Sequence, residues 1–371
     1  MIARVIFALF VLLALLGDAR IFLFIMNRVV FGSHRQERSP WHFLMYAAPP
    51  VLLVLTGLFW IVGRWFDRPN ETDSLLASVG AAWLIIAAAV GGYWVLDRLR
   101  VNVFGEPPLV GIRTLPAEGQ KTHAINVAYD LELTRHEIFI DDLPEALDGY
   151  RIAFLTDTHV APIVPDHFYR EIISHVTKFD PHLILLGGDF VTWRRHIPLL
   201  ADRLIGHLRA RDGVFAILGN HDYWAGAEEV TAAMEACGVS FLTNASIASP
   251  LQLVGIDEIY RGNPDVEQAF AKVDPNKPCI AISHHPDVID FLGGRRVDLL
   301  LCGHTHGGQI RFPFFGAVVV PSHHEAEFAA GFHRVGNVLM YVSRGIGSIP
   351  PVRILCRPEV ATFVLRRGHR T

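Results

Sequence analysis

Side chains of the kinds that bind metal ions fall in five short blocks in the middle of the chain. Two blocks have the pattern Asp-x-His or His-x-His, and side chains two residues apart at the end of a strand point to one side. Each such pair is therefore expected to clamp an ion, and the blocks together predict a two-metal hydrolase site. The blocks are Asp157-Thr158-His159, Gly188-Asp189, Gly219-Asn220-His221-Asp222, His284-His285-Pro286 and Gly303-His304-Thr305-His306.

The ligand types indicate which metal ions this site would hold. Imidazoles and carboxylates with one amide oxygen suit Mn²⁺, Fe or Zn²⁺, whereas an all-oxygen set suits Mg²⁺ or Ca²⁺. Two such ions about 3.5–4 Å apart lower the pKa of a bridging water towards roughly 7 and aim the hydroxide at phosphorus. We therefore expect two divalent ions, Mn²⁺ first with Fe or Zn²⁺ as alternatives, and hydrolysis of a phosphoric ester or diphosphate bond.

An apolar run directly precedes each block, as expected for a buried strand whose carboxyl end reaches a site. Helical patterns separate these runs, and strands that alternate with helices predict an α/β fold. A further alternating segment at 124–140 predicts a strand that joins the edge of the sheet, before a turn at 144–150. The apolar runs are 152–155, 183–186, 214–218, 279–282 and 297–302, and the helical patterns are 165–179, 196–210 and 227–237.

In their order, the five blocks resemble the calcineurin-like metallophosphoesterases, and this resemblance covers roughly residues 149–367. The stretches 303–310 and 341–347 look like the membrane-attached branch of that family. This branch includes transmembrane metallophosphoesterase-domain proteins and UDP-2,3-diacylglucosamine pyrophosphatases of the lipid A pathway. The resemblance implies a four-layer sandwich, with two stacked sheets flanked by helices. Periodicity alone would not distinguish that fold from a single doubly wound sheet.

The resemblance also implies the metal ligands, and position within the blocks suggests roles for His221, Asp222 and His285, with packing alone as the other interpretation of His221. His221 would act on the substrate without binding metal, either as a hydrogen-bond donor to the phosphoryl group or as the acid for the leaving group. Asp222 would orient that imidazole or serve as a turn or cap. His285 is expected at the surface, unless the opposite register puts it in place of His284. One metal would be held by Asp157, His159 and His306, the other by Asn220, His284 and His304, with Asp189 bridging both.

Three other features have two interpretations each. His323-His324 is expected to be a solvated pair rather than a third metal site. Within 343–347, Arg344 would either reach a phosphate or belong to a plain glycine turn, which is favoured. The run 312–320 would form an apolar lip for acyl chains or pack in the core.

The composition predicts a membrane region before the catalytic domain. The chain of 371 residues is 51% hydrophobic with a mean hydropathy of +0.31, which is too apolar for one soluble domain. Apolar segments at 5–26, 43–62 and 75–96 are each about 20 residues long, enough to span about 30 Å as helices. We expect an all-α transmembrane region at 1–103, a Gly- and Pro-containing linker at 104–118 and the metallophosphoesterase domain at 119–371.

Charge placement predicts the orientation. Five arginines flank one side of the spans and three flank the other, which favours an integral membrane protein with a cytoplasmic catalytic domain. Asp18 and Arg20 are expected to pair with each other near the interface. The four cysteines are expected to fill the core. The arginines of the cytoplasmic side are Arg28, Arg35, Arg38, Arg98 and Arg100, against Arg4, Arg64 and Arg68.

Three classes of function compete. The first is a membrane-bound phosphoesterase that acts on a lipid-linked phosphodiester or pyrophosphate, which the resemblance narrows to UDP-2,3-diacylglucosamine or a similar lipid. The second is a phosphatase or nuclease, but a net charge of −4 and a pI of about 6.5 argue against nucleic acid as a partner. The third is a membrane sensor or transport protein with a regulatory hydrolase domain, for which the apolar spans would make a poor pore. The sequence leaves the oligomeric state open.

Overall fold

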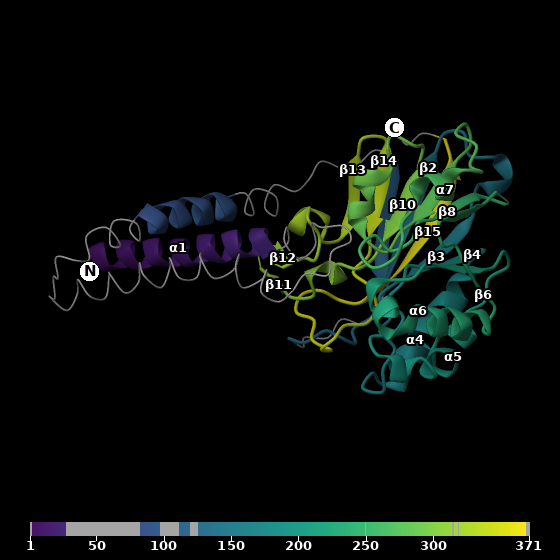
Figure 1. Cartoon of the computed structure of the whole chain (residues 1–371), viewed down its shortest axis with the longest axis horizontal. Coiled ribbons are helices and arrows are strands. Elements are labelled where there is room, and N and C mark those ends of the chain that lie inside the picture. Colours follow the sequence, from purple (N-terminus) through teal and green to yellow (C-terminus); the bar gives the residue numbers. More distant parts are fainter. Residues whose placement is uncertain are drawn as a thin grey trace. The chain divides into compact units, whose positions relative to one another are not determined.

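The computed structural model describes residues 2–26, 82–96, 111–118, 125–248, 250–313, 315–317 and 319–368. The chain divides into two compact units (Figure 1). The larger unit comprises 107–312 and 317–371, and the smaller comprises 1–106 and 313–316.

The larger unit contains two mixed β-sheets. The first has the strand order β1-β2-β15-β3-β4-β5-β6, and the second has the order β13-β14-β10-β9-β8-β7. The strands of the first sheet are β1 (Ile112–Glu118), β2 (Glu132–Ile140), β15 (Glu359–Arg367), β3 (Arg151–Leu155), β4 (Leu183–Leu186), β5 (Val214–Ala216) and β6 (Val239–Phe241). Those of the second are β13 (Gly331–Val335), β14 (Val338–Val342), β10 (Leu299–Cys302), β9 (Cys279–Ile282), β8 (Gln252–Gly255) and β7 (Ala245–Ile247).

The strands that precede the ligand blocks are parallel and lie inside the sheets. In the first sheet β3, β4 and β5 pair in parallel, and in the second β9 pairs in parallel with β8 and β10. Every residue of β4, β9 and β10 is buried, as their continuous apolar sequences require for strands covered on both faces. The predicted strand at 124–140 is shorter, and it is not the edge because β1 pairs outside β2.

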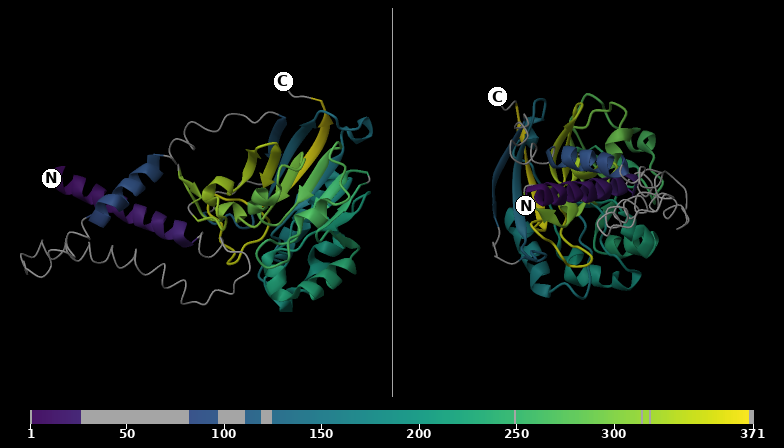
Figure 2. Two further views of the ribbon diagram at one scale, coloured as in Figure 1. Left: turned by 45° about the horizontal axis from the view of Figure 1, so that its top comes forward. Right: turned by 90° about the vertical axis from the view of Figure 1, so that its left-hand side faces the viewer.

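Buried apolar side chains form three clusters, one between the two sheets and one on the outer face of each sheet. One cluster joins residues of both sheets, including Phe154 and Leu301, so the sheets stack face to face (Figure 2). A second cluster packs the first sheet against α4 (Asp166–Phe179), α5 (Leu199–Arg203) and α6 (Asn220–Glu235). A third packs the second sheet against α7 (Val266–Phe270) and the 3₁₀ helix η6 (Pro286–Phe291). The order is helix, sheet, sheet, helix, as the family resemblance implied.

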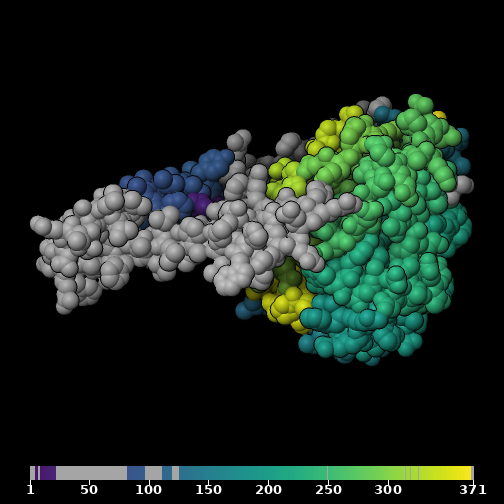
Figure 3. Space-filling view, viewed as in Figure 1, coloured from purple at the N-terminus to yellow at the C-terminus, as the bar shows by residue number. Residues whose placement is uncertain are grey.

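Two of the three predicted helices differ from their predicted ranges. α4 agrees with its predicted range, whereas 196–210 contains only the five-residue α5 with 3₁₀ turns on either side. α6 begins at Asn220, seven residues before the predicted start, and Gly226 interrupts it at a φ of 121°. In the space-filling view these helices form the teal surface of the unit (Figure 3).

In the smaller unit, α1 (Ile2–Met26) packs against a helix at 82–96. A Cβ atom on Gly17 would lie 1.6 Å from the carbonyl oxygen of Ala87, so the two backbones touch at this point. Nε1 of Trp83 donates a hydrogen bond to Oδ1 of Asp18 at 3.1 Å. Asp18 was expected to pair with Arg20. Among the described residues, no helix has both the length and the apolarity to cross a bilayer. The predicted span at 43–62 and residues 75–81 of the predicted span at 75–96 lie outside these residues.

Candidate metal centre

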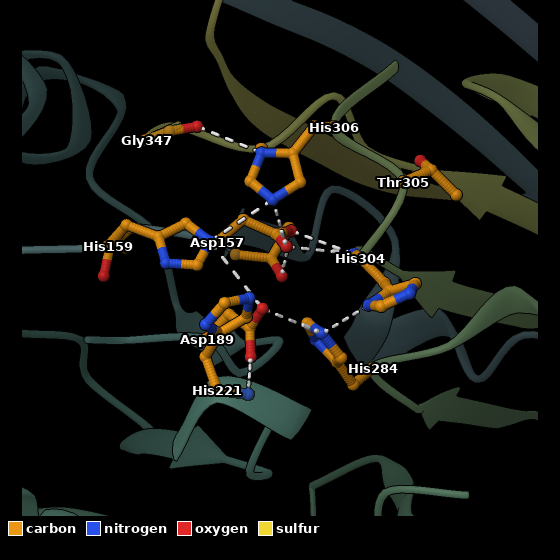
Figure 4. Close-up of polar contacts among 12 residues, drawn as sticks. Asp157, His159, Asp189, His221, His284, His304, Thr305, His306 and Gly347 are labelled. Atoms are coloured by element: carbon orange, nitrogen blue, oxygen red, sulfur yellow. Dashed lines mark hydrogen bonds and ion pairs between the residues drawn. The ribbon is translucent and has the colours of Figure 1, made fainter. Parts of the chain in front are cut away.

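The ligand blocks follow β3, β4, β9 and β10 and come together where both sheets end (Figure 4). Two groups of ligand atoms form there, and within each group all ligand atoms lie within 4.8 Å of one another. The first group is Asp157, His159, Asp189 and His306, and the second is Asp189, His284 and His304.

Asp189 belongs to both groups. Its Oδ2 atom lies 3.7 Å from Nε2 of His159 and 3.4 Å from Nε2 of His284. One carboxylate oxygen therefore faces an imidazole of each group, which is the position that a bridging ligand would take. The grouping of the six residues agrees with the predicted division between two metals.

The local backbone is not what the period-two argument assumed. β3 ends at Leu155 and β10 at Cys302, so both His-containing pairs lie beyond their strands. Asp157, His159, Asp189, His304 and His306 all have positive φ values, between 41° and 68°. Such conformations are costly for these residues and cluster at functional sites. His304 and His306 consequently enter different groups, and the prediction that each pair clamps one ion is wrong for them.

Glycines in the blocks give the carboxylates room. A Cβ atom on Gly219 would lie 2.2 Å from Oδ1 of Asp189, and one on Gly303 would lie 2.4 Å from Oδ2 of Asp157. No side chain fits at either position without displacing a carboxylate, which explains the glycine before Asn220 and before His304.

The ring nitrogens fit a pair of metal ions. The carbonyl of Gly187 accepts from Nδ1 of His284 at 2.7 Å, and the carbonyl of Gly347 accepts from Nδ1 of His306 at 3.1 Å. Because carbonyls only accept, these rings carry Nδ1–H, so Nε2 is the nitrogen of each ring that can bind a metal ion. Nδ1 of His159 likewise lies 2.8 Å from the Thr192 hydroxyl.

The Nε2 atoms of His159 and His306 face each other at 3.2 Å. Two lone pairs at this distance repel unless a proton or a cation lies between them. Burial lowers the pKa of His159 to about 3 and that of His306 well below its usual value, so both imidazoles are neutral at pH 7. Neutral imidazoles are the form that binds metal, and the donor set therefore fits a binuclear centre.

Asn220, the remaining predicted ligand, is the first residue of α6 and is 7% exposed. Its buried side-chain oxygen has no hydrogen-bond partner among the described residues. An amide oxygen left in this state costs free energy unless another group binds it, so this atom also fits a metal ligand.

His221 and Asp222 do not form the predicted orienting pair. The Asp222 carboxylate accepts from the backbone N–H groups of Phe190 at 2.8 Å and Gly219 at 3.0 Å, so it caps α6 and holds the Asp189 loop. Nδ1 of His221 is buried and has no hydrogen-bond partner among the described residues. The His221 ring instead packs edge-on against Trp224, with ring centroids 4.7 Å apart.

The structure also places His285 and Arg344, which had two interpretations each. His285 is 1% exposed, so the expected surface position is wrong, and its ring lies 3.5 Å from that of His304 between centroids. Arg344 forms ion pairs with Glu132 and Glu359, which link it to the sheet rather than to a phosphate.

One supporting residue had no signal in the sequence. Arg353 is fully buried, and its guanidinium donates to the carbonyls of Gly347 at 2.5 Å and His306 at 3.4 Å. It therefore fixes both ends of the hydrogen bond that orients the His306 ring. It lies 47 residues after His306, outside every block.

Comparison with known proteins agrees with the site. The family model for calcineurin-like phosphoesterases matches residues 150–308. Phosphodiesterase YaeI of Escherichia coli (strain K12) is 32% identical over 243 residues, which make up 63% of this chain and 88% of that protein. The transmembrane protein with metallophosphoesterase domain of Danio rerio is 30% identical over 264 residues, 66% of this chain and 59% of that protein. UDP-2,3-diacylglucosamine pyrophosphatase LpxG of Chlamydia trachomatis is 25% identical over 272 residues, 58% of this chain and 83% of that protein.

A buried carboxylate shared by two groups of imidazole ligands, at the ends of two stacked sheets, defines a binuclear-metal phosphoester hydrolase. The chain belongs to the calcineurin-like phosphoesterase family.

Proposed function

We propose that this enzyme is membrane-bound and hydrolyses a phosphodiester or pyrophosphate bond of a lipid-linked substrate such as UDP-2,3-diacylglucosamine. Mn²⁺ is the proposed metal, with the seven predicted ligands in the roles given above. When bound, the two ions would supply an activated water and neutralise the phosphoryl charge. His221 would contact the phosphoryl group or the leaving group from the start of α6.

Exposed apolar side chains beside the site carry the proposal of an amphiphilic substrate. Phe312 is 52% exposed and lies six residues after His306, and Ile349, 40% exposed, follows Gly347, which orients that ring. Trp224 is 56% exposed and packs on His221. Large apolar side chains on three segments that adjoin site residues in the sequence suit acyl chains better than a polar nucleotide alone. The Chlamydia relative is named a UDP-2,3-diacylglucosamine pyrophosphatase, which supports the same substrate class.

The test compares the acylated substrate with its deacylated headgroup in the full-length Phe312→Ser variant. Complete burial of a Phe side chain contributes roughly 1.5–3 kcal/mol, and about half of this surface is already covered, so about 1 kcal/mol remains. We expect kcat/KM for the lipid to fall about fivefold while that for the headgroup stays unchanged. Leu115→Ser, on a strand that carries no site residue, is the control and should change neither. Equal losses on both substrates, or none, would argue against acyl-chain binding at this position.

We propose a cytoplasmic catalytic domain on the basis of the arginines that flank the apolar segments. The Danio rerio relative is named a transmembrane protein, which supports membrane attachment. A reporter that is active only outside the cytoplasm, fused after Thr371, should give no signal, whereas one that is active inside should give a strong signal. The reverse pattern would overturn the topology and leave the metal chemistry unaffected.

A further inference from the structure

A second cluster of imidazoles and carboxylates lies beside the metal centre, in the larger unit. It joins η6 to the loop before the 3₁₀ helix η8 (Glu325–Phe328). Asp287, His323 and His324 each present a ligand atom within 4.8 Å of the other two. Asp290 contributes a further carboxylate, whose Oδ2 lies 2.8 Å from Nε2 of His323 and 2.9 Å from Nε2 of His324.

The buried carboxylate of Asp287 sets the proton position on His323. Its Oδ2 lies 3.1 Å from Nδ1 of His323, and the same oxygen accepts from the Tyr260 hydroxyl at 2.8 Å. The Tyr260 hydroxyl gives its proton to Asp287, so its oxygen accepts from Nδ1–H of His323 at 3.2 Å, and the lone pair of the neutral ring lies on Nε2. In the neutral ring this lone pair then faces the Asp290 carboxylate, and the contact is favourable only if a proton or a cation lies between them.

The geometry points to a third metal ion. We propose that Nε2 of His323, Nε2 of His324 and the carboxylate of Asp290 bind one divalent transition-metal ion, with Asp287 orienting His323. Two imidazoles and a carboxylate are a common ligand set for Zn²⁺, at about 2.0–2.2 Å from the ion. Ligands around a tetrahedral ion at that radius are about 3.4 Å apart, so Asp290 would move back by about half an ångström. Its side chain is 43% exposed and free to do so, and the two histidines, at 27% and 28%, leave a path for the ion.

The cluster is connected to the metal centre through His285. Nδ1 of His285 is buried, has no hydrogen-bond partner among the described residues and points to Asp287 Oδ2 across 3.5 Å, which is too long for a hydrogen bond. The other side of the ring lies against His304. An ion held by His323 and His324 would fix Asp287, and Asp287 in turn limits the movement of the ring that supports His304.

The experiment counts bound metal. Full-length protein is stripped of metal, saturated with Zn²⁺, desalted and analysed by inductively coupled plasma mass spectrometry. We expect three ions per wild-type chain and two in both His324→Ala and Asp290→Asn, with basal phosphodiesterase activity retained. His207→Ala, at an exposed histidine outside the cluster, should keep three.

Two outcomes would overturn the third site: two ions in the wild-type chain, or three ions in both cluster variants. Asp189→Asn separates this result from the binuclear centre, because it should lose ions there and keep the ion of the cluster. Circular dichroism shows whether each variant is folded. If His324→Ala does not fold, the metal content of Asp290→Asn alone decides whether the third site exists.

Discussion

Replacing Asp189 with Asn is expected to remove at least one of the two metal ions and to lower turnover on the order of 10³-fold. One Asp189 oxygen faces an imidazole of each ligand group, at 3.7 Å and 3.4 Å. An amide at this position has no charge, so its oxygen is a much weaker ligand for two cations than the carboxylate oxygen. Loss of a residue that only supports a ligand costs about 10–100-fold, and loss of a shared ligand should cost more.

Metal content and turnover of the purified Asp189→Asn variant should be measured together after loading with Mn²⁺. Asp166→Asn is the matched control, because the same change falls on an exposed carboxylate of α4 and should leave both quantities unchanged. If the Asp189 variant held the full complement of metal and kept its activity, the ligand assignment would be wrong.

The sequence predicted the metal centre because its ligands are chemically distinct and each block follows an apolar run. The strands at 183–186 and 279–282 have the predicted bounds, and their carboxyl ends bring residues of two sheets together. The alternation of side chains along a strand nevertheless does not explain how the ligand side chains are oriented. Asp157 and His159 have left-handed backbone and lie close to Gly345 and Gly347, a packing that residue spacing does not reveal.

Supporting contacts were missed because they connect distant parts of the chain. Thr192 meets His159 across 33 residues, and Arg353 reaches His306 across 47. Neither residue lies in a pattern that separates it from other threonines or arginines. The start of α6 was missed because its first turn is polar, and because a cap was only one of two roles expected for the Asp222 carboxylate.

His221→Ala should separate catalysis from metal binding. The His221 ring lies 4.9 Å from that of His159 between centroids, yet it belongs to neither ligand group. We therefore expect the variant to keep both ions of the binuclear centre and to lose about 10²–10⁴-fold in kcat, the range typical of a lost proton donor.

Asp222→Ala is the contrasting variant, because this carboxylate holds backbone N–H groups of two loops and forms no hydrogen bond with Nδ1 of His221. Loss of such a cap costs about 1–2 kcal/mol, so its melting temperature should fall. Melting temperature, metal content and kcat should be measured for both variants with the same substrate. An unchanged kcat in His221→Ala would remove this residue from the reaction, and loss of metal from that variant would make it a ligand. A large loss of kcat with full metal content and an unchanged melting temperature is the result that a group acting on the transition state requires, because such a group contributes little to the ground-state structure.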